Sequence, residues 1–257
     1  MTVGSFAERH IGTDATAQRA MLDALGYESV DALVEAAVPA SIHAAPREGS
    51  RIPLAATEAE ALGELRELAS RNRVSRSLIG LGYYDTLTPA VIARNVFENP
   101  SWYTAYTPYQ PEISQGRLEA VLNFQTMVAD LTGLDIANGS LLDEATAAAE
   151  AMAVAFRAYK SGGTRFIVDP DTHPQTIGVL RTRAKTLGIR IAVIPMPKNL
   201  PEDCFGSMIS YPGSSGKLRD IAADIDVTHA GGGMAIVCCD LLALTLLTSP
   251  GELGADM

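Results

Sequence analysis

From Gly163 onward, short apolar runs alternate with helical patterns, and this alternation restricts the possible fold more than any other feature of the chain. The apolar runs are RFIVD, RIAVIP, SMISYPG and MAIVCCD, and segments such as HPQTIGVLRTRAKTLG and GKLRDIAADIDVTHAGG have helical character. Apolar runs joined by helices are typical of a parallel sheet with crossover helices. Ligands of such sheets bind at the carboxyl ends of the strands, where we expect Asp169, Tyr211 and Asp240.

Residues 1–75 carry helical patterns instead. A polar cap precedes a helix that Gly26 ends, SVDALVEAAV predicts a second helix, and Thr57 with Glu60 forms a capping box ahead of a third. The linker HAAPREGSRIPLAAT has no periodicity. We therefore expect a helical N-terminal segment over 1–75 and an α/β domain over 76–257.

An aromatic loop is predicted over 101–116. It contains three tyrosines at a spacing of three, with prolines among them: Tyr103, Tyr106, Tyr109, Pro108 and Pro111. Because the prolines forbid a continuous helix, we expect a rigid extended loop. Two interpretations stay open: the tyrosines pack structurally, or the loop forms a lip over a substrate or an interface.

Two helices are predicted after this loop. Apolar residues at helical spacing indicate the first over 117–131, which Gly133 ends. Asp143 caps the second, whose small residues ATAAAEAMAVA allow another backbone to come close. We expect this second helix to be buried against a sheet or a neighbouring subunit.

Composition excludes several classes of protein. The chain has 257 residues and a net charge of −10, which argues against nucleic-acid or anionic-membrane partners because both require a basic surface. Its three cysteines lack metal-ligand spacing, and no metal site is expected. An odd cysteine count and the absence of a signal-like or membrane-spanning apolar run favour a cytoplasmic protein.

Short motifs give weak signals. Tyr211–Lys217, YPGSSGK, lies between a strand and a helix but lacks the first glycine and the final Ser/Thr of a phosphate loop, so a plain turn is favoured. The glycines at 231–233 precede a strand instead of following one, and Ser140 lacks a nucleophile elbow. Among four histidines, His173 alone lies where chemistry is plausible, although a helix-start or packing role fits it equally well.

Long stretches of the chain resemble glycine decarboxylase, the P-protein of the glycine cleavage system, and specifically the N-terminal half of that family. The resemblance rests on FAERHIGT, on SLIGLGYYDTLTPAVIARNVFENPSWYTAYTPYQPEISQGRLEAVLNFQTMVADLTGLDIANGSLLDEATAAAEAM, and on VDPDTHPQT, SYPGSSGKLRD and DLLALTLLTSPGELGAD. It spans nearly the whole chain, and YTPYQPEISQG is highly specific.

The resemblance implies a fold and a reaction. The family enzyme has two related halves, each similar to a fold-type I pyridoxal phosphate subunit, with the active site between them. This chain would therefore be a helical segment followed by part of such an α/β domain, with a mainly parallel sheet that is incomplete at the C-terminus. The implied reaction is decarboxylation of glycine with pyridoxal phosphate as the electron sink, followed by transfer of the aminomethyl group to the lipoyl arm of the H-protein.

The resemblance also implies that this chain lacks the catalytic lysine. Its four lysines match no cofactor position: Lys160, Lys185, Lys198 and Lys217. The Schiff-base lysine would lie in the C-terminal half, so we expect neither covalent cofactor nor turnover from this chain alone. His173 and Asp240 resemble the ring-stacking histidine and the ring-nitrogen aspartate of the other half, and we expect them to be vestigial as cofactor ligands.

The residues implied to face the shared active site lie in two loops: Tyr83, Tyr84, Tyr106, Tyr109, Gln110, Glu112 and Gln115. The resemblance implies that they bind glycine or gate the lipoyl arm, and that several contact the C-terminal half. The implied partners are that half, the lipoylated H-protein and glycine, in an enzyme that is an oligomer when complete.

The alternative function is a non-catalytic interaction or scaffold module derived from the same fold. A free-standing module should close its sheet, whereas TLLTSPGELGADM leaves Leu246 and Leu247 without a following element. From this we expect a truncated chain with apolar surface that promotes association.

Overall fold

The chain divides into two compact units, residues 1–77 and 78–257, each of which is described by itself. The computed structural model describes residues 5–44, 49, 52–53, 55–103, 107, 110–160 and 162–257. None of the helices within these ranges is both long and apolar enough to cross a membrane.

The described part of the first unit contains four helices: α1 (Phe6–His10), α2 (Ala15–Leu25), α3 (Val30–Ala37) and α4 (Glu58–Ser70). Gly26 ends α2 in the left-handed conformation, with φ of 78°. Thr57 and Glu60 form the predicted capping box of α4, with Glu60 accepting from the Thr57 N–H at 2.8 Å. The predicted helices are therefore confirmed. Leu22 is the one buried apolar residue among the described residues of this unit, which has little core of its own.

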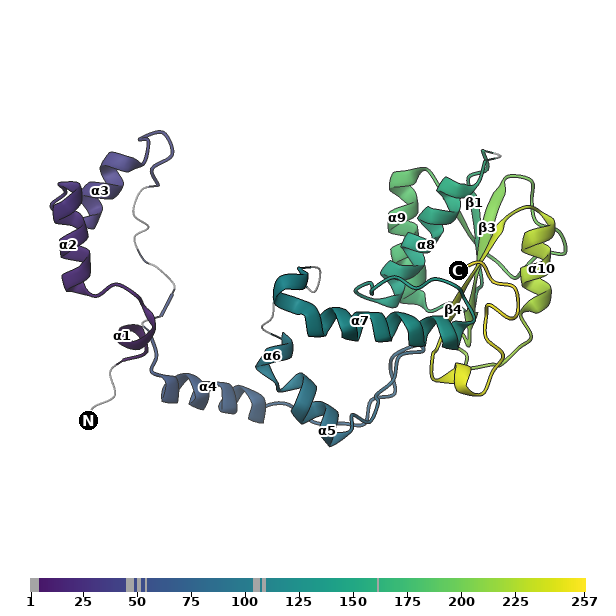
Figure 1. The fold of residues 1–257 in the computed structure, drawn as a ribbon, viewed down its shortest axis with the longest axis horizontal. Helices are drawn as coiled ribbons and strands as arrows, with labels where there is room; N and C mark the ends of the chain where they lie inside the picture. The colour runs from purple at the N-terminus through teal and green to yellow at the C-terminus, as the bar shows by residue number, and fades with distance from the viewer. Residues whose placement is uncertain are drawn as a thin grey trace. The chain divides into compact units, whose positions relative to one another are not determined.

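The second unit contains the predicted parallel sheet (Figure 1). Its strands, within the described residues, are β1 (Arg165–Val168), β2 (Arg190–Val193), β3 (Cys204–Tyr211) and β4 (Met234–Cys239), in the order β2-β1-β3-β4. All three pairings are parallel. The backbone of Met257 pairs with Ala235 and Val237 beside β4, with its carbonyl accepting from the Val237 N–H at 2.8 Å.

Helices cover both faces of the sheet. Helices α8 (Glu144–Ala158) and α9 (Pro174–Leu187) lie against one face and α10 (Ala222–Ala230) against the other (Figure 1). β3 is buried along its whole length and supplies both cores: Met208 packs with α8 and α9, and Ile209 packs with α10. The small residues of α8 are mostly buried against these neighbours, which confirms the close approach that was expected of them.

Between residues 88 and 132 lie α5 (Ala90–Ile92), a π-helical turn η1 (Ala93–Phe97), α6 (Pro100–Tyr103) and α7 (Pro111–Thr132). The helix predicted over 117–131 is confirmed, since it lies within α7, which Gly133 ends. The extended loop expected over 101–116 is therefore wrong at both ends. Proline is well placed in a first helical turn, where its missing N–H is not required, so Pro111 starts α7 instead of ending a loop.

Candidate functional site

A tight turn at residues 80–83 is the most constrained backbone segment near the carboxyl edge of the sheet. The N–H of Tyr83 donates to the carbonyl of Gly80 at 3.2 Å. The two central residues, Leu81 and Gly82, have φ of 52° and 114°, as a turn of type I′ requires. Leu81 is the one residue other than glycine with positive φ among the described residues. Such a conformation persists only where surrounding contacts fix it.

Side chains that follow β1 and β3 fix this turn. Ser214, in the loop after β3, donates its hydroxyl to the carbonyl of Leu81 at 2.9 Å. Gln175, in the first turn of α9, donates to the carbonyl of Gly80 at 3.2 Å. Nδ1 of His173 lies 2.7 Å from the Ser214 hydroxyl. Gln175 thus binds the carbonyl of Gly80, Ser214 binds the carbonyl of Leu81, and His173 binds Ser214.

The imidazole of His173 packs against two residues of the turn, Gly82 and Tyr83. A Cβ atom added at Gly82 would overlap this ring, so the backbone of Gly82 approaches the imidazole as only a glycine can. The ring of Tyr83 packs on the same imidazole, with centroids 4.9 Å apart and planes at 55°. His173 is therefore covered by the turn, which we name the tyrosine turn (residues 80–84).

The tyrosine turn presents two of the predicted site residues outward. Tyr83 is 43% exposed and Tyr84 is 75% exposed. Exposed aromatic side chains on a rigid turn offer contact area at low cost in conformational entropy. The structure therefore brings Tyr83 and Tyr84 together at the carboxyl edge of the sheet, beside His173.

The other predicted site residues lie elsewhere in the second unit. Tyr106 and Tyr109 lie outside the described residues. Gln110 is the extended residue before α7. Glu112 and Gln115 lie in the first turns of α7 and are exposed, which corrects the expectation that an extended loop carries them.

A kink separates the start of α7 from the rest of the helix. Ser114 has non-helical φ and ψ of −135° and 27°. Its hydroxyl donates to the carbonyl of Thr107 at 3.1 Å, and the residue is 5% exposed. This buried hydrogen bond ties the beginning of α7 to the preceding segment and fixes the direction in which Glu112 and Gln115 project.

Asp171 organises the glycine-serine turn after β3. The carboxylate of Asp171 accepts from the Ser215 N–H at 2.9 Å and from the Ser215 hydroxyl at 2.7 Å. Its backbone carbonyl accepts from the Ser214 N–H at 2.7 Å. The structure thus has the expected turn at YPGSSGK, and the Ser214 and Ser215 N–H groups are bound within the chain.

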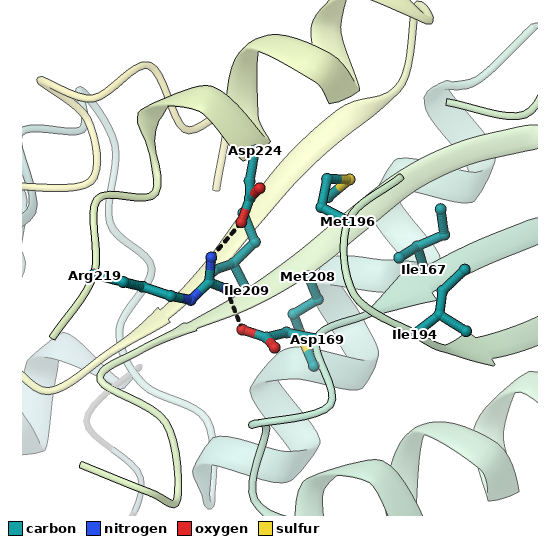
Figure 2. Close-up of a pocket in the computed structure, with 8 residues that line it drawn as sticks. All are labelled: Ile167, Asp169, Ile194, Met196, Met208, Ile209, Arg219 and Asp224. Atoms are coloured by element: carbon teal, nitrogen blue, oxygen red, sulfur yellow. Dashed lines mark hydrogen bonds and ion pairs between the residues drawn. The ribbon is translucent and has the colours of Figure 1, made fainter. Parts of the chain in front are cut away.

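A small pocket lies on the α10 side of the same edge, where Arg219 bridges two carboxylates, Asp169 and Asp224 (Figure 2). Burial alone would lower the pKa of Arg219, but the hydrogen bonds that its guanidinium donates to Asp224 and Asp169 outweigh burial and raise that pKa. Apolar residues, including Met196 and Ile209, form the rest of the wall. Arg219 is already neutralised by its two partners, so this pocket has no free cation for an anionic ligand.

The remaining cofactor candidates do not assemble a pyridoxal phosphate site. Asp240 follows β4, is exposed, and accepts from the Leu242 N–H at 3.0 Å. The lysines lie exposed on the surface: Lys160, Lys185, Lys198 and Lys217. The imidazole of His173 is in contact with Gly82 and Tyr83 of the tyrosine turn. The residues present in this chain therefore do not fit the cofactor.

No group of three or more His, Cys, Asp or Glu side chains within the described ranges is placed to hold a metal ion. The cysteines are free thiols. Burial raises the pKa of Cys204, Cys238 and Cys239, with Cys239 reaching about 11. These thiols are neutral near pH 7 and are poor nucleophiles.

A four-stranded parallel sheet with helices on both faces and a candidate site at its carboxyl edge defines the class: a mixed α/β protein of the fold-type I, pyridoxal-phosphate-enzyme kind. The model of one family, the glycine cleavage system P-protein, matches residues 8–257. The chain belongs to the glycine cleavage system P-protein family.

Solved structures agree with this assignment. The chain is similar to a crystal structure of glycine decarboxylase (P-protein) of the glycine cleavage system in inhibitor-bound form, with 32% identity and a TM-score of 0.84 over 96% of this chain. The chain spans 56% of that protein's length. A cysteine desulfurase from Escherichia coli is more distantly similar, with 14% identity and a TM-score of 0.42 over 62% of this chain and 43% of the desulfurase chain.

Sequence reasoning missed the side chains that hold the tyrosine turn. The sequence gives no indication that Ser214 or Gln175 contacts this turn, and it indicates for His173 only a helix-start, packing or vestigial cofactor role. The available signal was the pair of glycines in GLGYY, since glycines flanking one residue are typical of a turn with positive φ. The partners of that turn are distant in sequence and could not be identified from it.

Proposed function

We propose that this chain supplies the N-terminal half of a cytosolic glycine decarboxylase of the glycine cleavage system. In this proposal it lends the tyrosine turn to an active site that a complementary half completes. The complete enzyme releases CO2 from glycine and passes the aminomethyl group to the lipoyl arm of the H-protein. The supporting observation is the pinned turn at the carboxyl edge, with Tyr83 and Tyr84 exposed, in a chain of the P-protein family.

Exposed apolar side chains support the need for a partner half. They are concentrated between α5 and the middle of α7: Val91, Phe97, Tyr103, Ile113, Leu122 and Met127. Exposed apolar surface of this kind marks interaction sites in soluble proteins. In the proposed enzyme the complementary half, in an oligomer, covers this surface.

Pyridoxal phosphate, when bound in the complete enzyme, supplies an electron sink for loss of CO2. Since the residues of this chain do not fit that cofactor, the proposal assigns both cofactor and Schiff-base lysine to the complementary half. The hydroxyls of Tyr83 and Tyr84 donate hydrogen bonds to the anionic substrate and their rings exclude water. The proposal also assigns substrate binding or gating of the lipoyl arm to Gln110, Glu112 and Gln115 at the start of α7, and to Tyr106 and Tyr109, which lie outside the described residues.

Reconstitution tests the proposed function. The chain is mixed with a complementary P-protein half loaded with pyridoxal phosphate, and exchange of labelled bicarbonate into the carboxyl group of glycine is followed with lipoylated H-protein present. We expect exchange from the mixture and none from this chain alone. A chain that stays monomeric, ignores the other half and yields no exchange would instead support the scaffold-module alternative.

The cytosolic location is part of the same proposal. Three free thiols, of which Cys204 is buried, suit a reducing compartment, where disulfides do not persist. Fractionation of the source cells, with the chain detected by an antibody, tests this part separately.

A further inference from the structure

The hydrogen bonds around Ser214 have only one consistent arrangement. The carbonyl of Leu81 cannot donate, so the single proton of the Ser214 hydroxyl goes to Leu81 at 2.9 Å. The hydroxyl must then accept from Nδ1 of His173 at 2.7 Å. The imidazole is therefore protonated on Nδ1, and His173, Ser214 and Leu81 form a directed chain of hydrogen bonds.

This chain of hydrogen bonds acts on the strained part of the turn. Leu81 holds a positive φ of 52°, which a branched side chain rarely adopts. Its carbonyl is the acceptor at the end of the hydrogen-bond chain. Gln175 holds the carbonyl of Gly80 one residue earlier. The hydrogen bonds that the carbonyls of Gly80 and Leu81 accept therefore stabilise the positive φ at Leu81.

The imidazole also sets the position of the aromatic side chains. It contacts Gly82 on one side of the turn and packs on the ring of Tyr83. Tyr84 follows directly and has the most exposed ring of the turn. One half-buried histidine thus determines both the path of the backbone and the direction in which the tyrosines project.

We propose that His173 and Ser214 are positioning residues that lock the tyrosine turn for the active site. This inference rests on the proposed function, because the locked tyrosines act on substrate only in the assembled enzyme. His173 supports the polypeptide through its contacts with Ser214, Gly82 and Tyr83. Neither residue touches the substrate; both act through Tyr83 and Tyr84.

Amide hydrogen exchange measures the lock in the chain without any activity. We expect Ser214→Ala and His173→Ala to accelerate exchange at residues 80–84 by about fivefold or more, as loss of one or two hydrogen bonds predicts. Ser140→Ala is the matched control, since its exposed hydroxyl donates to the carbonyl of Leu141 and not to the tyrosine turn; it should leave 80–84 unchanged. Ser214→Thr, which keeps the hydroxyl, should restore protection.

Nitrogen-15 spectroscopy of the labelled histidine gives a second signature. The Nδ1-protonated form of His173 should be seen in the wild type and should be lost in Ser214→Ala. A mutant that unfolds would lose protection throughout the unit, whereas a released turn loses it at 80–84 only. Unchanged exchange at 80–84 in both Ser214→Ala and His173→Ala would overturn the lock.

Reconstituted enzyme tests the positioning role. We expect Ser214→Ala to lower kcat/KM for glycine by about tenfold, with unchanged assembly and with recovery in Ser214→Thr. Faster exchange at 80–84 with unchanged kcat and KM would show that Ser214 stabilises the tyrosine turn, but would overturn its role in positioning the tyrosines for the substrate. A wild-type assembly without activity would defeat the proposed function and the role that rests on it, whereas hydrogen exchange would still decide the lock.

Discussion

Asp171 and Ser215 form a paired contact at the carboxyl edge of the sheet: the Ser215 N–H donates to Oδ1 at 2.9 Å and the Ser215 hydroxyl donates to Oδ2 at 2.7 Å. One carboxylate therefore organises the turn that carries Ser214. The Ser214 and Ser215 N–H groups, both bound by Asp171, are therefore not open to an anion.

Loss of the Asp171 carboxylate should destabilise the second unit. Asp171→Ala leaves the Ser215 N–H and hydroxyl without their partner, and charged hydrogen bonds of this kind contribute about 1.5–3 kcal/mol each. We expect the free energy of unfolding to fall by about 2–4 kcal/mol, measured by urea denaturation. Asp171→Asn keeps one acceptor and should cost less; equal losses in both variants would contradict the assignment.

Pyridoxal phosphate should not attach stoichiometrically to the isolated chain. Its lysines are exposed, and Gly82 and Tyr83 lie against the imidazole of His173. After mixing with the cofactor, we expect no discrete Schiff-base absorbance band and no single phosphopyridoxyl lysine after borohydride reduction. One lysine trapped at full occupancy would show that the cofactor site is in this chain after all.

The contact between α8 and the sheet should be far more sensitive than the exposed side of the same helix. Met152 is fully buried, whereas Val154 is 48% exposed. Met152→Ala should lower the free energy of unfolding by about 2–5 kcal/mol through lost burial and a residual cavity. Val154→Ala, the matched control, should change it by less than about 1 kcal/mol. Similar effects at both sites would mean that α8 is not packed as described.

Stability should decline at alkaline pH through Cys239. Burial raises the pKa of this thiol from near 9 to about 11 in the folded chain. Between these values the unfolded chain loses its proton first, so it binds fewer protons and the free energy of unfolding falls as pH rises. We expect a decline of up to about 1.4 kcal/mol per pH unit between pH 9 and 11. Cys239→Ala should reduce the slope by about this amount, while the raised pKa of the Cys204 and Cys238 thiols maintains the rest of it; an unaltered slope would exclude Cys239 as a source.

Local patterns predicted most of the fold because the relevant physics is local. Alternating apolar runs and helical periods indicated the sheet, and the caps at Asp143 and Thr57 set helix starts to the residue. The prediction that Pro111 belongs to an extended loop is wrong, because proline breaks the interior of a helix but is well placed in its first turn. The sequence does not show where α7 begins, and the start of this helix is held by the hydrogen bond between Ser114 and Thr107, which is a tertiary contact.

The candidate site was only partly predictable for a different reason. The resemblance pointed to Tyr83 and Tyr84, and both lie together on the tyrosine turn. The contacts that hold them join positions 81, 173 and 214, which are brought together only by tertiary structure. No local propensity links a serine after one strand to a carbonyl more than a hundred residues earlier, so Ser214 had no signal of its own.

The most direct test of the central claim is the steady-state rate of glycine decarboxylation by the reconstituted enzyme carrying Tyr84→Ala. The account predicts that kcat/KM for glycine falls by at least about tenfold. Assembly and cofactor absorbance should match the wild type. Tyr159→Phe is the control, since its hydroxyl contacts the carbonyl of Glu202 at 3.4 Å, away from the turn, and it should keep full activity. Wild-type kcat and KM in both Tyr84→Ala and the double variant Tyr83→Phe/Tyr84→Phe would contradict the claim that this chain lends its tyrosine turn to the active site.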